Sequence, residues 1–453
     1  MSLTRRHVLA FGAVLAPGIA ISRAQAAPAP ISTLGLDGTH FGLRPGSPDD
    51  QSRTLQRALT EAARARVPLA LAPGVYRVGG LNLPSGAQLI GVRGATKLVL
   101  SEGAALLSAE GVDHVTLSGL VLDGLRQRLP ERRGLVHLEQ ARDIRIADCE
   151  IANAGGNGIH CVAVSGEITG TALSGTEEAA IHSLDARNLL IARNTIGGAG
   201  NNGIQVWRSD EGDDGTIVTG NRIEGIDNRS GGSGQYGNAI DVFRAGNVIV
   251  RGNRIRNCAF SAVRGNAASN IHIEGNAVSD VREVALYSEF GFEGALIANN
   301  VVDGAAIGVS VTNFSEGGRL AVIQGNIIRN LFPKRPAGTD PADGAGIGIA
   351  AEADTAVSGN VVENAPTAGI VLGFGSYLRD VAATGNVIRR AGIGIGVSVS
   401  SGAGSALIAN NLIADVVRGG IVGFDRQRIV TGDLMKAGAG KYRHLSISGN
   451  RLG

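Results

Sequence analysis

Titratable and aromatic side chains recur at one fixed place in a short phrase that repeats along the chain. The phrase is Gly or Ala, an apolar residue, a variable residue and a second apolar residue, as in the segment 203–206. Its period of two predicts a β-strand whose variable residue faces outward. The variable residues are, in order, His160, His182, Gln205, Asp241, Arg264, Tyr287, Ser310, Gly348, Val371 and Gly396. A second outward column, two residues further on, reads Val162, Leu184, Trp207, Phe243, Asn266, Glu289 and Thr312.

The outward residues change character along the chain. They are largely polar, charged or aromatic up to Glu289, and mostly small or apolar beyond Ser310. Aromatic rings beside polar groups suit the stacking of sugar rings, although bulky residues could also shield a sheet from association. We expect a polysaccharide partner, with substrate contacts from Gln205, Trp207, Tyr236, Phe243 and Asn266.

The same columns hold groups that could process an acidic polysaccharide by β-elimination or epimerisation. Such chemistry neutralises a uronate carboxylate, removes the C5 proton and supplies a proton elsewhere. Arg264 could neutralise, His182 could be the base and Tyr287 could donate the proton. The predicted catalytic residues are His160, His182, Asp241, Arg264, Tyr287 and Glu289, with Asp241 orienting Arg264.

Two other functions fit these residues. A glycoside hydrolase needs two carboxyl groups, and Asp241 and Glu289 are the only outward acids of the two columns. A non-catalytic carbohydrate-binding or cell-envelope repeat protein needs no catalytic pair, and the regular, Gly-rich later repeats favour it. A polysaccharide lyase or epimerase is our primary expectation, and the other two remain open.

An acidic segment follows Trp207 and suggests the one cofactor we consider, Ca²⁺. Carboxylate oxygens are ligands that Ca²⁺ prefers, although acidic turns are commonly just solvated. The candidate ligands are Asp210, Glu211, Asp213 and Asp214. A zinc site would need three protein ligands, and no third partner for His160 and His182 is evident. The segments 228–238 and 332–346 are expected to wall a groove on the same face.

A second phrase, apolar-x-Gly/Asn-Asn-x-apolar, indicates the fold. Short strands at a repeat of mostly about 25 residues predict a solenoid, and no repeat holds a long 3.6-period stripe. We predict an all-β, single-stranded parallel β-helix of about twelve or more coils, in which the repeated Asn forms the sharp turn and a ladder. The ladder positions are Asn194, Asn221, Asn253, Asn276, Asn300, Asn326, Asn360, Asn386, Asn411 and Asn450, with Cys149 in an earlier copy.

The segment before the repeats predicts a cap for the open end of the solenoid. Residues 49–66 read as a short helix with one apolar face, and coils follow over about 69–453. The helix, then Pro-Gly-x-Tyr at 73–76 and Leu-Pro-Ser-Gly-x-x-Leu-Ile-Gly at 83–91, resembles the start of the pectate-lyase-like right-handed parallel β-helix proteins. Together with the repeats and the N-terminus, the chain is most similar to twin-arginine-translocated repeat proteins of that superfamily.

This resemblance implies a right-handed coil and an active site on the outer face of one sheet. It covers nearly the whole chain after the first residues. The superfamily includes lyases, hydrolases, epimerases, esterases and non-catalytic fibre or adhesin modules, so the fold alone does not determine the reaction.

The N-terminus predicts export. Arg5 and Arg6 precede a short apolar run and a small-x-small site at 24–26, which is typical of a twin-arginine signal peptide over residues 1–26. We expect a single β-helix domain over 27–453, in the periplasm or secreted. No later segment is apolar enough to span a membrane, and we expect a monomer.

Composition excludes further classes. The 43% hydrophobic content argues against disorder, and a net charge of +2 gives no reason to expect nucleic acid. The three cysteines, Cys149, Cys161 and Cys258, are too few for a disulfide framework and are expected to be buried structural thiols.

Overall fold

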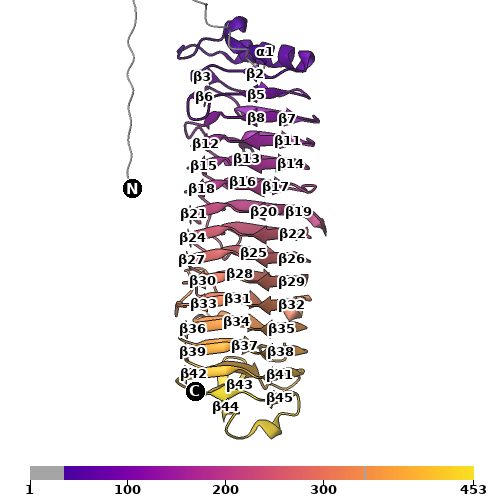
Figure 1. Ribbon diagram of the computed structural model, residues 1–453, viewed down its shortest axis with the longest axis vertical. Helices are drawn as coiled ribbons and strands as arrows, with labels where there is room; N and C mark the ends of the chain where they lie inside the picture. The colour runs from indigo at the N-terminus through magenta and orange to yellow at the C-terminus, as the bar shows by residue number, and fades with distance from the viewer. Residues whose placement is uncertain (1–34, 341–342) are drawn as a thin grey trace, which may run out of the picture. The chain divides into compact units, whose positions relative to one another are not determined.

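The computed structural model describes residues 35–340 and 343–453. The predicted signal peptide, residues 1–26, lies outside this part. Within it the chain forms 46 β-strands, which assemble into three long sheets because each strand pairs with its counterpart in the next coil. The coils stack along one axis (Figure 1). This arrangement confirms the predicted parallel β-helix.

We call the three sheets A, B and C. Sheet A has 16 strands, from β1 (Leu36–Asp37) to β45 (Leu445–Ser448), and sheet B has 15, from β3 (Gly74–Val78) to β46 (Arg451–Leu452). Sheet C carries the phrase with outward variable residues. Its strands are β4 (Leu81–Asn82), β7 (Leu107–Glu110), β10 (Gly134–Glu139), β13 (Asn157–Val162), β16 (Ile181–Leu184), β19 (Ile204–Asp213), β22 (Ile240–Gly246), β25 (Val263–Asn266), β28 (Val284–Glu289), β31 (Ile307–Val311), β34 (Ile347–Ala351), β37 (Ala368–Leu372), β40 (Ile395–Ser398), β43 (Ile421–Asp425) and β44 (Arg428–Asp433).

Inward-facing aliphatic residues form one continuous core along the axis. In sheet C, Ile159, Ile181, Ile204 and Ile240 pair in register and are fully buried. Full burial of one such side chain contributes about 1.5–3 kcal/mol relative to exposure. The core therefore fixes which face of each strand is left for function.

The repeated Asn residues form the predicted ladder. The Asn276 backbone N–H donates to Oδ1 of Asn300 at 2.9 Å, and its Nδ2 donates to the same oxygen and to the Val250 carbonyl, both at 3.0 Å. Equivalent bonds link every rung from Asn194 to Asn450. Each buried amide is thereby satisfied, as an interior position requires.

The sharp turn is made by the residue before each ladder Asn, so our assignment of the turn to the Asn itself was wrong. Gly275 has φ 64° and Asn299 has φ 57°, whereas the ladder residues that follow them do not have positive φ. The ladder amide is engaged between coils. The residue before it therefore adopts the left-handed conformation. This residue is usually glycine, which has no Cβ and adopts the conformation without a steric penalty.

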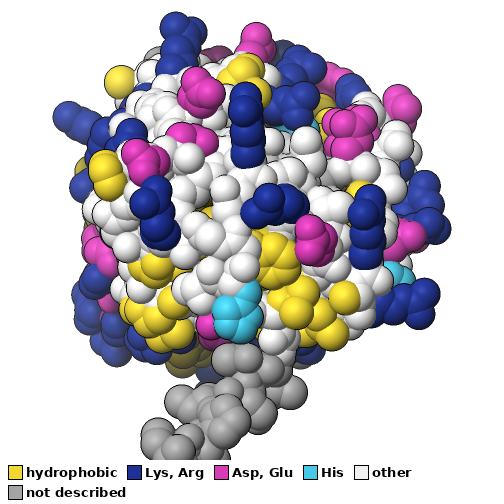
Figure 2. Space-filling model, turned by 90° about the horizontal axis from the view of Figure 1, so that it is seen from above, with side chains coloured by type: hydrophobic (Ala, Val, Ile, Leu, Met, Phe, Trp, Pro, Cys, Tyr) yellow, Lys and Arg dark blue, Asp and Glu magenta, His cyan; other side chains and the backbone are white. Residues whose placement is uncertain are grey.

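Helix α1 (Ser52–Ala65) is the predicted cap. Leu55, Ala58, Leu59 and Ala62 are buried against the first coils and belong to the main core. Ala63 of the same helix is only half-buried. Figure 2 looks down on this end and shows charged and other polar side chains spread over it, with hydrophobic ones in smaller areas. A polar outer face of this kind shields the open end of a solenoid.

At the other end, β43 and β44 pair in antiparallel fashion, and they are the one antiparallel pair among the strands of the described residues. Leu434, together with the half-buried Met435 and Tyr442, packs on the core there. No helix among the described residues is long and apolar enough to cross a membrane. The three cysteines are free and buried, and Cys258 ends the strand β24 (Arg254–Cys258).

Candidate active site

Strand pairing in sheet C aligns the outward residues largely in the predicted order. The first column runs through His160, His182, Gln205, Asp241, Arg264, Tyr287 and Ser310. The next residue is Ala350, so the placement of Gly348 was wrong. A Cβ at Gly348 would meet the side chain of Val362 in the core, and this residue therefore points inward. The column also begins earlier in the chain than predicted, because His137 pairs with His160 and Ser108 pairs with His137.

Arg264 lies at the centre of a group of buried charges. Its Nε is 2.6 Å from Oε1 of Glu289, and its Nη1 is 3.6 Å from Oε2 of Glu283. The Arg264 side chain is 11% exposed and the two carboxylates are 3% exposed. The guanidinium carbon also lies 5.3 Å from the ring centre of Tyr287. Arg264 therefore pairs with Glu289 and Glu283, rather than with Asp241 as we expected first.

A second arginine enters from the loop 332–346. Nη1 of Arg335 lies 3.6 Å from Oε1 of Glu283 and 2.7 Å from Oδ2 of Asp343. Ser261 Oγ donates to Oε2 of Glu283 at 2.9 Å. We call the whole group the acidic cluster; its members are Asp241, Arg264, Glu283, Glu289, Arg335 and Asp343.

Asp241 is the member of the acidic cluster that is set to exchange a proton. Its Oδ2 accepts a hydrogen bond of 2.7 Å from Nε1 of Trp207, and the residue is 4% exposed. Burial raises the pKa of Asp241 to about 7; the Arg264 charge and the Trp207 bond oppose this rise, and the Glu289 charge adds to it. This carboxyl therefore changes its charge near neutral pH, where catalytic acids and bases work.

The other buried groups of the site also have shifted pKa values. Burial raises the pKa of Glu283, although Arg264 and Arg335 lower it. Burial also raises the pKa of Tyr287, so its hydroxyl stays protonated. Burial lowers the pKa of Arg264, but Glu289 and Glu283 outweigh that effect and raise it overall. Arg264 is therefore a fixed positive charge.

Two loops cover the acidic cluster instead of merely walling a groove. The first connects β21 (Arg222–Ile226) to β22, and a side chain at Gly234 in this loop would overlap Nη1 of Arg264. Asn238 Nδ2 donates to the Gly234 carbonyl at 2.8 Å and holds the loop in place. Tyr236 lies half-buried in the same loop. The second loop supplies Arg335 and meets the first, because a Cβ at Gly338 would lie 3.4 Å from the Gly232 carbonyl.

The histidines form a separate stack. The ring centres of His137 and His160 are 5.0 Å apart, those of His160 and His182 are 4.7 Å apart, and His182 contacts the Trp207 ring edge-on at 5.3 Å. Burial and the neighbouring His137 lower the pKa of His160 to about 4, and burial with His160 lowers that of His182 to about 3. Both rings are therefore neutral at physiological pH and would be weak bases.

The remaining predicted contacts flank the acidic cluster. Gln205 is buried between His182 and Asp241 in the first column. Phe243 is half-buried beside Trp207, with their ring centres 5.8 Å apart. Asn266 Nδ2 donates to Oε1 of Glu289 at 3.2 Å. These residues border the acidic cluster on the Trp207 side and at Glu289.

The acidic segment after Trp207 does not assemble into a calcium site. Strand β19 continues to Asp213, so most of the segment is strand rather than loop. Asp213 accepts from Asn247, Asp214 is buried and accepts from the Thr216 backbone, and Asp210 and Glu211 are exposed. Over the described ranges, no three His, Cys, Asp or Glu residues gather as metal ligands.

Comparison with protein-family models agrees with a right-handed coil. A family model described as "Right handed beta helix region" matches residues 209–388, and one described as "Periplasmic copper-binding protein (NosD)" matches residues 85–236. No curated protein matches the chain. The fold is thus a right-handed parallel β-helix.

One solved structure with a TM-score above 0.5 shows the same fold at low identity, and two further matches lie below that score. The pre-mature gene product 12 of bacteriophage phi29 is 15% identical with a TM-score of 0.52; the match covers 92% of this chain and 57% of that one. The surface adhesin PfbA of Streptococcus pneumoniae is 16% identical, with a TM-score of 0.49 and coverage of 84% and 90%. The catalytic unit of an alpha-1,3-glucanase from Streptomyces thermodiastaticus is 14% identical, with a TM-score of 0.47 and coverage of 94% and 70%. This chain thus spans little more than half of the phage protein's length.

The residues of the NosD-matched segment do not fit a copper centre. Imidazoles suit copper, and His137, His160 and His182 all lie in this segment. Their rings lie against one another along the sheet, and Nδ1 of His160 shares a 3.1 Å hydrogen bond with Nδ1 of His137. Their nitrogens do not join any group of three potential ligands in the part of the chain that is described.

Sequence reasoning missed four participants, namely His137, Glu283, Arg335 and Asp343. His137 had a signal, because Val136-His137-Leu138 repeats the strand pattern of Ile159-His160-Cys161. Glu283 precedes its strand, and Arg335 belongs to a long loop. Neither residue occupies a position of the repeated phrase. Only the folded structure therefore shows that both lie near Arg264.

Proposed function

We propose that this right-handed parallel β-helix is a carbohydrate-active protein that hydrolyses a glycosidic bond at the acidic cluster of sheet C. The proposal rests on two carboxyl groups beside Arg264 whose environments differ. Asp241 has a pKa raised to about 7 by burial, whereas Glu289 forms a 2.6 Å ion pair with Arg264. Two carboxyl groups in different environments are how an enzyme separates an acid from a base.

The charge balance favours hydrolysis over elimination. The acidic cluster contains four carboxyl groups and two guanidinium groups, and therefore has an excess of negative charge when its carboxyl groups are ionised. A uronate substrate is an anion that such a site repels. The oxocarbenium-like transition state of glycoside hydrolysis is cationic, and the same site stabilises it.

The roles follow from the surroundings of each carboxyl group. Asp241, protonated up to neutral pH, donates its proton to the leaving oxygen. Glu289, held by Arg264 and Asn266, activates water on the opposite face of the sugar. Glu289 lies two coils from Asp241 and two residues further along its strand, about 12 Å away at the backbone. Side chains that lean together would bring the two carboxyl groups to the separation known for inverting enzymes, about 6.5–9.5 Å. We therefore expect inversion at the anomeric carbon.

Substrate access requires movement of the loop 227–239. Asp241 and Glu289 are 4% and 3% exposed, and Gly234 lies against Nη1 of Arg264. Displacing this loop would uncover Arg264 and the carboxyl group paired with it, and the half-buried ring of Trp207, which donates to Asp241, can stack on a sugar. Closure of such a loop also excludes water and strengthens the electrostatic interactions inside the site.

Elimination on a uronate is the second candidate, and one observation favours it. Nη1 of Arg264 is buried without a hydrogen-bond acceptor. A substrate carboxylate could fill that place once the loop has moved, with His182 or Asp241 as the base. The position of His182, in the histidine stack and with a pKa lowered to about 3 by burial, makes Asp241 the better base.

The test is a screen of the full chain against neutral and uronate polysaccharides. Hydrolysis produces reducing ends, and proton NMR of the first product gives its anomeric configuration. Elimination instead produces an unsaturated sugar with ultraviolet absorbance. We expect reducing ends that disappear in Asp241→Asn and Glu289→Gln and persist in the control Glu224→Gln, which changes an exposed carboxylate of sheet B. Absorbance without hydrolysis would replace the proposal by a lyase, and binding without turnover would make the protein a binding module.

We also propose export through the twin-arginine route, followed by removal of residues 1–26. The paired Arg5 and Arg6 support this route, and the match to a family described as periplasmic supports export. Replacing both arginines by Lys should retain the full-length chain in the cytoplasm, as fractionation and mass spectrometry would show. Unchanged export of that variant would argue for another route.

A further inference from the structure

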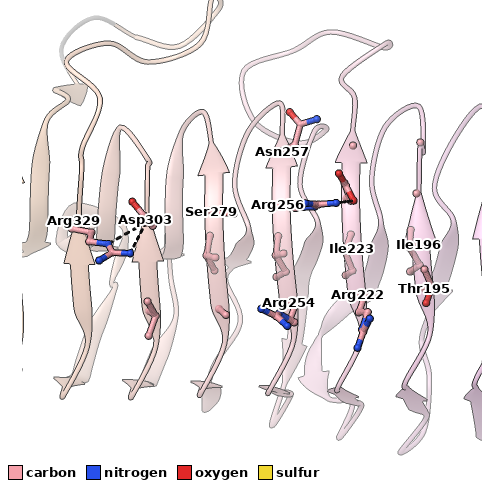
Figure 3. A pocket seen from close by; sticks show the side chains of 18 residues that line it. Thr195, Ile196, Arg222, Ile223, Arg254, Arg256, Asn257, Ser279, Asp303 and Arg329 are labelled. Atoms are coloured by element: carbon pink, nitrogen blue, oxygen red, sulfur yellow. Dashed lines mark hydrogen bonds and ion pairs between the residues drawn. The ribbon is translucent and has the colours of Figure 1, made fainter.

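The outer face of sheet B carries a groove that the proposed catalytic site does not use. It has a volume of about 960 Å³ and crosses the strands β18 (Thr195–Gly197), β21, β24, β27 (Ala277–Val281) and β30 (Val301–Asp303) (Figure 3). Its charged lining residues are Arg222, Glu224, Arg254, Arg256, Asp303 and Arg329. Four guanidinium groups thus face two carboxylates.

The two carboxylates of the groove are already paired. Glu224 Oε2 lies 2.5 Å from Nη2 of Arg256, and Asp303 Oδ2 lies 2.8 Å from Nη2 of Arg329. In Figure 3 these contacts appear as dashed lines, whereas none reaches Arg222 or Arg254. The excess positive charge of the groove therefore resides on Arg222 and Arg254.

These two arginines are direct neighbours. Arg222 pairs with Arg254 in the parallel ladder, so their backbones are about 4.8 Å apart. Both side chains are exposed and lie at the same end of their strands (Figure 3). The residues before and after them in the column are Thr195 and Ala277, which bring no negative charge. Like charges placed opposite each other destabilise a sheet unless a counter-charge is present.

We propose that Arg222 and Arg254 form a binding site for an oxyanion, a carboxylate, sulfate or phosphate group held between two guanidinium groups. A guanidinium presents a planar fork of N–H donors that matches such groups. Thr195 adds a hydroxyl at one side, and Arg256, already paired with Glu224, is a third guanidinium group in the groove. The site lies on a different sheet from Asp241 and is independent of the proposed hydrolysis.

The anion can be free or attached to a saccharide, and two probes separate these sources. Isothermal titration at low ionic strength would use sodium sulfate and, separately, a linear oligogalacturonate. We expect Arg222→Gln and Arg254→Gln each to weaken sulfate binding about tenfold or more, as loss of a charged hydrogen bond does. Tighter binding of the oligogalacturonate, lost in the same two variants, would identify a saccharide-borne anion. Equal affinity for both probes would identify an isolated anion.

Two control variants make the test decisive. Arg251→Gln removes one exposed positive charge from the neighbouring sheet A and should leave the affinity within about twofold of wild type. Asp241→Asn should bind sulfate normally, which separates this site from the proposed catalytic one. Sulfate binding that survives in the double variant Arg222→Gln/Arg254→Gln, or that falls equally in Arg251→Gln, would overturn the proposal. Thermal denaturation of each variant would verify that it is folded.

Discussion

The outer faces of sheets B and C have the same strand spacing and the same alternation, yet their charges are in opposite environments. On sheet B the Arg256 and Glu224 side chains are 64% and 49% exposed, whereas on sheet C those of Arg264 and Glu289 are 11% and 3% exposed. The difference comes from the loops 227–239 and 332–340, which lie against the acidic cluster on sheet C. In this molecule the solenoid provides the positions of charged groups, and insertions between coils decide whether those groups are buried.

Burial changes what an ion pair does. An exposed pair contributes about 0–1 kcal/mol to stability, because water and salt screen it. A buried pair brings little net stability, but removing one partner leaves an uncompensated charge and is strongly destabilising. Burial also raises the pKa of Asp241 to about 7. The covered face thus acquires proton chemistry that the open face lacks.

The largest expected effect separates the two faces directly. Arg264→Leu leaves Glu289 and Glu283 buried without their main counter-charge and should destabilise the chain by about 3–5 kcal/mol in urea denaturation. Arg256→Leu removes one partner of an exposed pair and should change stability by about 0–1 kcal/mol. Similar losses of stability in both variants would mean that the loops over the acidic cluster do not exclude water.

The next largest effect tests whether the loop 227–239 packs against Arg264. Gly234→Ala places a methyl group on Nη1 of Arg264 and should displace the loop, with faster cleavage of this loop in limited proteolysis. Gly231→Ala is a matched control in the same loop, because Gly231 also has positive φ but no atom lies within 4 Å of its added Cβ. Ala costs about 1–2 kcal/mol in the left-handed region, where Gly231 lies with φ 72°, and more at Gly234, whose φ is 144°. Only Gly234→Ala should exceed the cost at Gly231, and equal behaviour of the two would contradict the contact with Arg264.

A smaller effect concerns the histidine stack at the other end of the covered face. The folded-state pKa of His160 is lowered to about 4 by burial and His137, compared with an ordinary value of 6.5. The unfolded chain therefore binds more protons between pH 6.5 and 4, and stability falls as the pH falls through this window. His160→Phe should reduce that loss when unfolding free energy is measured at several pH values. An unchanged pH slope would show that His160 is hydrated in the folded chain.

The smallest effect lies on the open face. Arg222→Thr removes one of two like charges and continues the Thr195 column, so it should raise stability by a few tenths of a kcal/mol in the absence of anions. Adding sulfate should stabilise wild type but not this variant, since only a binding-competent folded state gains from the ligand. Destabilisation of the variant in anion-free buffer would contradict an uncompensated Arg222–Arg254 pair.

The fold was predictable because its determinants repeat. Each coil presents an aliphatic period-two phrase to the core, and each ladder Asn bonds the next, as Asn276 bonds Asn300. An interaction repeated this often leaves a visible period in the sequence. The turn residue was harder to assign, because Gly and Asn stand side by side in the phrase and both tolerate positive φ.

The site was predictable only where it follows the repeat. The columns through Asp241, Arg264 and Glu289 come from strand register, and the pairing reproduces them. Glu283 and Arg335 lie outside the repeat phrase, and the choice of Glu289 over Asp241 as the partner of Arg264 depends on side-chain reach. Burial by the two loops is a tertiary property, so the pKa of Asp241 could not be read from the sequence.

A titration of the Asp241 carboxyl group tests most directly whether this residue can act as the catalytic acid. Carbon-13 NMR of aspartate-labelled protein would follow its signal with pH, and the Asp241→Asn variant would identify that signal. We expect a midpoint near pH 7, because burial of Asp241 disfavours the charged form. A midpoint near the ordinary aspartate value of about 4 would show a hydrated, permanently ionised carboxylate and would contradict its role as the catalytic acid.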